Sequence, residues 1–254
     1  QPGAGGVVAA AAAAKATPDG YTLIWATIGA VTSLATRSDL SYTLDDLTPI
    51  AKTISFPGVI AVRADSPFKD FNQLMDFMKK NPGKLTMGSD GVGSSPQLNW
   101  MIVQSQAGVD PVHVPYKGAG PNNADLLGGQ IDFSVTVLGP VMPSLKAGTL
   151  RALAFFSPRR SVFFPSVPTT KELGYPESAR TSWQGFMGPA GIPAEVLSKL
   201  EGPIKKAASD PEVAKTLGEF GVEADYANAE EFKAFLHDEL NSYKVIVEKF
   251  NLKN

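Results

Sequence analysis

The sequence contains no cysteine and only two histidines, His113 and His237. The absence of cysteine excludes disulfides, thiolate metal sites and cysteine nucleophiles, although it says little about the compartment. His113 lies in the apolar-leaning run 112–114, and His237 lies in a charged segment that we expect to be helical. For both, a structural or surface role is favoured over metal ligation. We therefore predict no metal site and no cofactor.

A strong net charge is also missing. The 23 lysines and arginines nearly balance the 25 aspartates and glutamates, which leaves a net charge of −2 and a pI near 5.8. The charges are scattered along the chain and give no broad attraction to nucleic acid or to an anionic membrane. A nucleic-acid partner is not expected.

Long apolar runs are absent too. No run approaches the roughly 20 residues that cross a bilayer, and the alanine-rich segment 7–14 has no basic flank of the kind that precedes a signal sequence. We expect any signal peptide to lie outside this chain. The 254 residues, 43% of them hydrophobic, suffice for one large domain or two moderate ones, and we predict two.

What the chain does contain is a glycine-punctuated stretch at 84–98, which reads as a short strand, a loop and the first turn of a helix. Gly88, Gly91 and Gly93 allow tight turning and close approach to a ligand. A serine at 94 or 95 can cap the helix, and Pro96 suits its first turn. The free N–H groups at such a helix start favour a carboxylate or a phosphate.

This stretch alone leaves a plain strand-to-helix connection open. It matches neither the dinucleotide fingerprint nor the phosphate loop of nucleotide-binding proteins. A second candidate wall of a site follows the apolar strand expected at 21–26, where residues 27–30 read as a loop of small residues. There, too, an ordinary connection is equally compatible with the sequence.

Between residues 84 and 156 the sequence alternates strand, loop and helix, which predicts a parallel sheet with right-handed crossovers. The loops after the strands, at 89–94, 116–121 and 136–140, should share one edge, where such sheets bind ligands. The expected strands are 85–88, 112–115, 131–138 and 150–156, and the expected helices are 94–106, 121–128 and 141–147.

The remaining segments predict how the domains are connected. We interpret 49–63 as the passage into a middle domain, after which the chain returns to finish with helices. Two crossing segments make a hinge and a closing cleft plausible. The other helices are expected at 7–15, 71–80, 194–208, 211–220 and 229–251.

Ten segments, in order along nearly the whole chain, resemble the Bug-type substrate-binding proteins of tripartite tricarboxylate transporters. One such match would mean little, but ten in register are specific. The segments are Pro2–Gly6, Ala16–Leu23, Leu47–Ile50, Pro82–Leu85, Gly88–Ser94, His113–Gly118, Asp125–Asp132, Leu150–Ala154, Pro165–Thr169, and Trp183 with Pro189–Pro193.

The resemblance implies an α/β, type II periplasmic binding-protein fold, with two doubly wound α/β domains joined by a hinge. Domain 1 would comprise residues 1–61 and 184–254, with its N-terminal strand missing from this chain, and domain 2 residues 62–183. The implied protein is a periplasmic binding protein that closes over a small carboxylate and delivers it to a membrane permease. We expect it to be a monomer.

In that family, backbone amides, hydroxyls and ordered waters hold the ligand's carboxylates. Lys117 would raise the local potential, although a solvated surface role is equally open. Tyr116 and Trp183 would pack the apolar part of the ligand, with core packing as the alternative for Trp183. The implied binding residues are Thr27, Ile28, Gly29, Ser89, Asp90, Gly91, Gly93, Ser94, Tyr116, Lys117, Gly118 and Thr136.

Three departures from the family pattern matter. A strand and a Pro-Gly-Gly loop that normally come first, and that contribute to the site, are not in this chain. Gln97 stands where the family often has histidine, which keeps hydrogen bonding but loses a titratable group. Thr136 stands where receptors for amino acids offer an acidic group, and this favours a plain mono- or dicarboxylate.

The competing function is a serine-dependent α/β hydrolase that acts on a carboxylate ester through Ser94 or Ser89. It lacks a G-x-S-x-G elbow and has only two histidines to choose a base from. A paired-carboxylate enzyme would use Asp90 and Asp132, but Asp132 is expected at the start of a strand, away from the ligand edge. A third possibility is a scaffold or sensor partner. We predict a binding protein that is not an enzyme.

Overall fold

A computed structural model describes residues 6–249, and the chain divides into two compact units. Of the described residues, 6–55 and 183–249 form unit 1, and 56–182 form unit 2. The predicted segment Pro2–Gly6 lies outside the described residues except for Gly6, and so does the end of the helix expected at 229–251.

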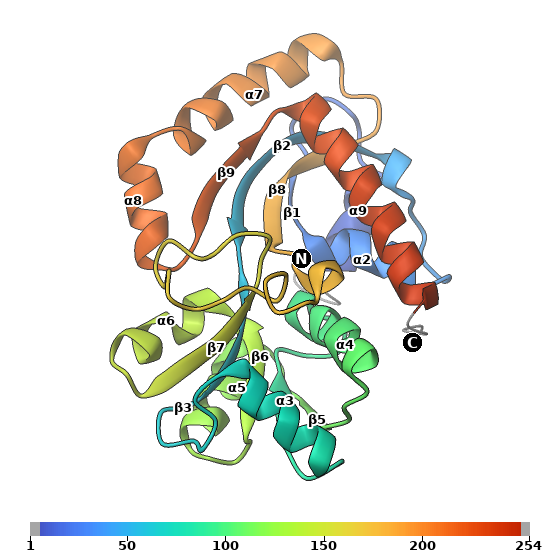
Figure 1. The fold of residues 1–254 in the computed structure, drawn as a ribbon. Helices are drawn as coiled ribbons and strands as arrows, with labels where there is room; N and C mark the ends of the chain where they lie inside the picture. Colours follow the sequence, from blue (N-terminus) through green and yellow to red (C-terminus); the bar gives the residue numbers. More distant parts are fainter. Residues whose placement is uncertain (1–5, 250–254) are drawn as a thin grey trace. The chain divides into compact units, whose positions relative to one another are not determined.

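Unit 1 is built on a four-stranded sheet in the order β1-β8-β2-β9. β1 pairs antiparallel with β8, and β2 pairs antiparallel with β9. Helix α9 packs against α2, while α7 and α8 lie beside β9 (Figure 1). The strands are β1 (Ile24–Thr27), β2 (Leu47–Phe56), β8 (Ser182–Pro189) and β9 (Glu223–Ala227), and the helices are α1 (Val7–Ala13), α2 (Ile28–Thr36), the 3-10 turn η2 (Leu44–Asp46), α7 (Ala194–Ala208), α8 (Pro211–Glu219) and α9 (Ala229–Lys249).

Unit 2 contains a five-stranded sheet in the order β5-β4-β6-β3-β7. β4 is parallel to both β5 and β6, whereas β3 runs antiparallel to its neighbours β6 and β7. The strands are β3 (Gly58–Arg63), β4 (Thr86–Ser89), β5 (Val112–Pro115), β6 (Phe133–Val137) and β7 (Leu150–Phe156), and the helices are α3 (Phe71–Lys80), α4 (Ser95–Ala107), α5 (Ala119–Leu127), α6 (Leu138–Lys146) and the 3-10 turn η3 (Pro176–Ser178).

Three predictions about local structure were wrong or incomplete. The loop expected at 136–140 is absent, because β6 runs to Val137 and α6 begins at Leu138. The loop expected at 27–30 does not exist, because α2 begins at Ile28 directly after β1 and buries Ile28, Ala30 and Val31 along one side. β9 was not anticipated, since its sequence, Glu-Ala-Asp-Tyr-Ala, has little strand propensity and takes its form from pairing with β2. The parallel arrangement of β4, β5 and β6 is confirmed.

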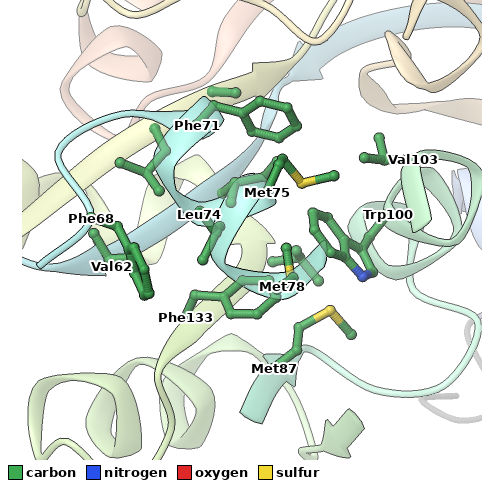
Figure 2. Packing of buried hydrophobic residues seen from close by; sticks show 14 of the residues in the cluster. Val62, Phe68, Phe71, Leu74, Met75, Met78, Met87, Trp100, Val103 and Phe133 are labelled. Carbon is green, nitrogen blue, oxygen red and sulfur yellow. The ribbon is translucent and has the colours of Figure 1, made fainter. Parts of the chain in front are cut away.

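One face of the unit 2 sheet is covered by α3 and α4. The N-cap of α3, Asp70, accepts a hydrogen bond from the backbone N–H of Gln73 (2.9 Å). Figure 2 shows Phe71, Leu74, Met75 and Met78 packed with Trp100 and Phe133, and the last two rings meet edge to face at 5.1 Å. These apolar residues of α3 recur at helical spacing and so form one buried stripe. The cluster fixes α3 and α4 on the strands that lead to the edge discussed below.

The opposite face is covered by α5 and α6. Val59 and Ala61 of β3 point to this side, while Ile60 and Val62 point to the other, as alternation along a strand requires. Leu126 of α5 packs in this second cluster. Because both faces are covered, β4 is buried up to its last residue, Ser89, and β6 is buried up to Thr136.

We expect Phe133→Ala to lower the free energy of unfolding by about 3–5 kcal/mol, because the truncation leaves a cavity under Trp100. Phe220, which is 63% exposed, provides a control of the same chemistry, and Phe220→Ala should change stability by less than about 0.5 kcal/mol. Urea unfolding of the three proteins measures this. Equal losses for the two variants would contradict the placement of Phe133.

Candidate functional site

Three parallel strands of unit 2 end at one edge, and a helix begins just after each of them. β4 leads into α4, β5 into α5, and β6 into α6. The unpaired N–H groups of three helix starts, together with the positive ends of three helix dipoles, therefore face the same edge. This is the edge at which open α/β sheets bind ligands, and helix starts favour anions there.

The loop between β4 and α4 depends on two glycines. Gly91 has φ of 126° and Gly93 has φ of 78°, conformations that disfavour any side chain. A Cβ on Gly91 would also lie 3.1 Å from the carbonyl oxygen of Tyr116. The backbone N–H of Gly93 donates to Oε1 of buried Gln97 (3.1 Å). The side chain of Gln97, which stands where the family often has histidine, therefore fixes the loop between β4 and α4.

The start of α4 carries two hydroxyls that have no protein partner. Ser94 is the N-cap, but its side chain makes no capping hydrogen bond. The Oγ atoms of Ser94 and Ser95 are both buried and have no hydrogen-bond partner among the described residues. Since buried polar groups are nearly always paired, these two hydroxyls lack a partner of the kind that an anion bound at the helix start would supply.

Asp90 is the hub of the edge. Its Oδ1 accepts hydrogen bonds from Nδ2 of Asn122 (2.9 Å) and Oγ1 of Thr136 (2.7 Å), and its Oδ2 accepts one from the backbone N–H of Val137 (3.1 Å). Burial raises the pKa of Asp90, while the three donors oppose that rise. Thr136 is fully buried. The carboxylate thus joins the end of β4 to α5 and to the end of β6.

The segment after β5 contributes three predicted residues. Tyr116 donates its hydroxyl proton to Oδ2 of Asp125 (2.7 Å), and burial together with this carboxylate raises the pKa of Tyr116 to about 12. Its backbone N–H donates to the carbonyl oxygen of Ser89 (3.0 Å). Lys117 is exposed, and Gly118, with φ of 106°, is the N-cap of α5. The tyrosine ring is therefore fixed to α5, while the lysine remains accessible.

Ser89, the predicted residue at the end of β4, is fully buried, and its Oγ lies 2.7 Å from Nε2 of His113 on β5. Burial lowers the pKa of this histidine. A serine and a histidine at this distance invite comparison with a nucleophile and its base, but the hydroxyl is closed off from solvent. Asp132 accepts from the N–H and hydroxyl of Thr86, at the opposite end of the strands from Asp90. No paired-carboxylate arrangement forms between Asp90 and Asp132.

The predicted residues Thr27, Ile28 and Gly29 belong to unit 1. Thr27 ends β1 and is the N-cap of α2, and Ile28 is buried in the first turn. They repeat, in the other unit, the strand-to-helix arrangement of unit 2. Trp183 is buried and meets the rings of Phe232 and Phe235 edge to face, so the core-packing interpretation of this residue is confirmed.

Sequence reasoning missed the contributions of Asn122 and His113 to this edge. Asn122 lies on α5, and its amide approaches β4 so closely that a Cβ on Gly88 would lie 2.3 Å from Oδ1 of Asn122. Gly88 is visible in the sequence, but it indicates only that some other part of the chain approaches the backbone closely at that position. Its partner is distant in the chain and becomes adjacent only when α5 packs on the sheet.

Two further properties concern the described residues 6–249. No helix in that range is both long and apolar enough to span a membrane. No group of three histidine, cysteine, aspartate or glutamate side chains within it is arranged to hold a metal ion.

A family model described as the tripartite tricarboxylate transporter family receptor, TctC, matches residues 1–252. The chain belongs to this family. The predicted resemblance is thereby confirmed, and the chain is a Bug-type solute-binding protein rather than an enzyme.

Two curated relatives come from Bordetella pertussis. The chain is 32% identical to a UPF0065 protein of that species over 254 residues, which cover 100% of this chain and 79% of the relative. It is 31% identical to Protein BugT over 254 residues, which cover 99% of this chain and 78% of that protein.

Solved structures agree with the fold. The periplasmic binding protein BugD superposes with a TM-score of 0.87 at 27% identity, covering 99% of this chain and 85% of that one. R. palustris Rpa4515 with adipate gives 0.88 at 25% identity, with the same coverages. MatC (Rpa3494) from Rhodopseudomonas palustris, with bound malate, gives 0.84 at 27% identity, covering 96% and 85%. The predicted periplasmic binding-protein fold is confirmed.

We expect Asp90→Asn to lower the free energy of unfolding by about 1–3 kcal/mol, because the new amide N–H₂ meets another donor among Asn122, Thr136 and Val137. Asp65→Asn is the control, since that carboxylate is exposed and forms a surface ion pair with Arg63. Urea unfolding compares them. If Asp90→Asn were as stable as Asp65→Asn, the hydrogen bonds to the Asp90 carboxylate would not be needed for stability.

The half-buried His113 predicts a pH effect on stability. Because burial lowers the pKa of His113, acidification from about pH 6.5 protonates the unfolded chain before the folded one, and stability falls as the pH drops. His113→Gln should flatten this decline, whereas His237→Gln, at a histidine with a 42% exposed side chain, should keep it. Urea unfolding between about pH 7.5 and 5 measures the slopes. An unchanged slope in His113→Gln would contradict this assignment.

Proposed function

We propose that the chain is an extracytoplasmic receptor that captures a small mono- or dicarboxylate and delivers it to the membrane permease of a tripartite tricarboxylate transporter. The observation that carries the proposal is the pair of buried, unpartnered hydroxyls of Ser94 and Ser95 at the start of α4. They lie on an edge where three helices begin. Both features favour an anion over a neutral solute.

Recognition would proceed mainly through backbone and hydroxyl donors. The N–H groups of the first turns and the two serine hydroxyls would hold one carboxylate group, and exposed Lys117 would raise the local potential. Gly91, Gly93 and Gly118 would allow the backbone to approach the ligand closely.

Asp90 and Thr136 have a structural role and do not contact the ligand in this proposal. Their side chains bind each other and neighbouring protein donors, so we assign them the task of fixing the edge to which the ligand binds. Ser89, whose hydroxyl meets His113, shares this task, and Tyr116 borders the edge through its backbone. Thr27, Ile28 and Gly29 of unit 1 are proposed as additional ligand contacts, to be tested by their own variants.

The solved relatives support a dicarboxylate. MatC was solved with bound malate and Rpa4515 with adipate, two dicarboxylates of different length and polarity. The periplasmic description of BugD supports an extracytoplasmic location. A monomer is proposed, because the strands and helix starts that form the edge all come from one chain.

The test is a thermal-shift and calorimetric screen of the purified protein against malate, succinate, adipate, citrate, benzoate and glutamate. We expect a dicarboxylate to raise the melting temperature, because binding to the native state alone stabilises it by about 2.7 kcal/mol at a ligand concentration about 100 times Kd. Binding of none of these acids would refute the proposal. A response to citrate alone or to glutamate alone would refute the assigned ligand class, because citrate has three carboxylates and glutamate carries an ammonium group.

Serine variants locate the site. For the acid that binds, Ser94→Ala and Ser95→Ala should each weaken affinity by about 10- to 100-fold, since a hydrogen bond to a charged group contributes about 1.5–3 kcal/mol. Ser134→Ala is the matched control: its hydroxyl is also buried and unpartnered among the described residues, but it lies within β6. Equal effects in all three variants would place the ligand elsewhere.

A further inference from the structure

β4 and β5 bring a histidine and a serine together beside the loop that follows β4. The strands are parallel, with His113 opposite Met87 and Ser89 opposite Pro115. His113 is half-buried, and its Nε2 lies 2.7 Å from Oγ of Ser89. This is a short hydrogen bond between two strands, made at the last residue before the loop turns.

The same serine hydroxyl also meets the loop backbone. The N–H of Gly91 donates to Oγ of Ser89 (3.3 Å), and Oγ lies 3.4 Å from the carbonyl oxygen of Gly91. That carbonyl also accepts from the N–H of Ser94, the N-cap of α4 (3.2 Å). The hydroxyl therefore lies between the imidazole and Gly91. The φ of Gly91, 126°, is one that residues with a side chain rarely adopt.

The imidazole fixes this hydroxyl in either neutral tautomer. If Nε2 carries no proton, the hydroxyl proton points to it, and the oxygen lone pairs are left for the N–H of Gly91. If Nε2 is protonated, it donates to Oγ, and the hydroxyl proton turns to the carbonyl oxygen of Gly91. In both cases the Ser89 hydroxyl takes one orientation. Its hydrogen bond with Gly91 then holds that glycine in one position.

We propose that His113 is a positioning residue, which sets the conformation of the loop 89–94 through the hydroxyl of Ser89. It does not touch the ligand. Because the loop leads directly into Ser94 and the start of α4, a fixed Gly91 keeps the donors of that helix start aimed at the ligand edge. The effect on affinity rests on the proposed function, whereas the effect on the loop does not.

The proposal predicts which substitutions of His113 are tolerated. Glutamine reaches to about the position of Nε2 and offers both an acceptor and a donor, so it can serve Ser89 in either role. Leucine fills similar space without a polar atom. Asparagine is polar but too short to reach, and it provides a second disrupting variant should the leucine variant fail to fold.

The first measurement is amide hydrogen exchange by NMR on the ligand-free protein. We expect His113→Leu and His113→Asn to speed amide exchange at Gly91 about fivefold, because each loses about the free energy of one ordinary hydrogen bond. The exchange rate in His113→Gln should stay within about twofold of that of the parent protein. Ser89→Ala should match the leucine variant, and the double variant Ser89→Ala/His113→Leu should exchange no faster than Ser89→Ala alone.

Controls separate positioning from general loosening. The slowest amides of β4 and β6 should be unchanged in every variant, and His237→Leu should leave Gly91 unaffected. Exchange at Gly91 that is unaltered in both His113→Leu and His113→Asn would overturn the proposal. So would a glutamine variant as fast as these two, or additive effects in the double variant.

The second measurement is calorimetric affinity for malate and adipate. We expect about a fivefold or greater loss of affinity in His113→Leu and near-parent affinity in His113→Gln. If the parent binds neither acid while the exchange pattern holds, the proposed dicarboxylate function fails and the positioning role stands. If the acids bind but exchange at Gly91 is insensitive to His113, the positioning role fails and the receptor function stands.

Discussion

The proposed ligand edge depends on one partly buried carboxylate. Asp90 accepts hydrogen bonds from Asn122 of α5 and from Thr136 and Val137 at the end of β6, and so ties two other segments to the end of β4. A charge in that position is costly unless it is fully paired, and here the pairing is made entirely by neutral donors. This crosslink holds α5 and the end of β6, where α6 begins, beside the loop that leads to α4.

Near Asp90, some side chains bind other parts of the protein and fix the edge, whereas other groups have no protein partner among the described residues. Gln97 binds the loop backbone, and Tyr116 is bound to α5. The hydroxyls of Ser94 and Ser95 are left without partners among the described residues. A receptor must hold its donors in place before the ligand arrives, since ordering them on binding would reduce affinity. The observed division meets that requirement.

Elements with a strong periodic pattern were predictable to within a few residues. The apolar stripe of α3 predicted the helix 71–80, and the apolar run of β7 predicted the strand 150–156. The start of α2 was not predictable, because small residues after a strand are as typical of a loop as of a first helical turn. β9 was not predictable either, since its residues become a strand only by pairing with β2.

The sequence by itself determined the family, the alternation of strands and helices, and the edge at which the glycine-containing loops meet. These follow from local propensity and from the rule that parallel strands end together. Only the tertiary structure decided which side chains at that edge are free and which are engaged. Asp90, predicted as a ligand contact, meets Asn122 32 residues away, and Ser89 meets His113 24 residues away. Hydrogen-bond partners so distant in the chain leave no local pattern and are selected by packing alone.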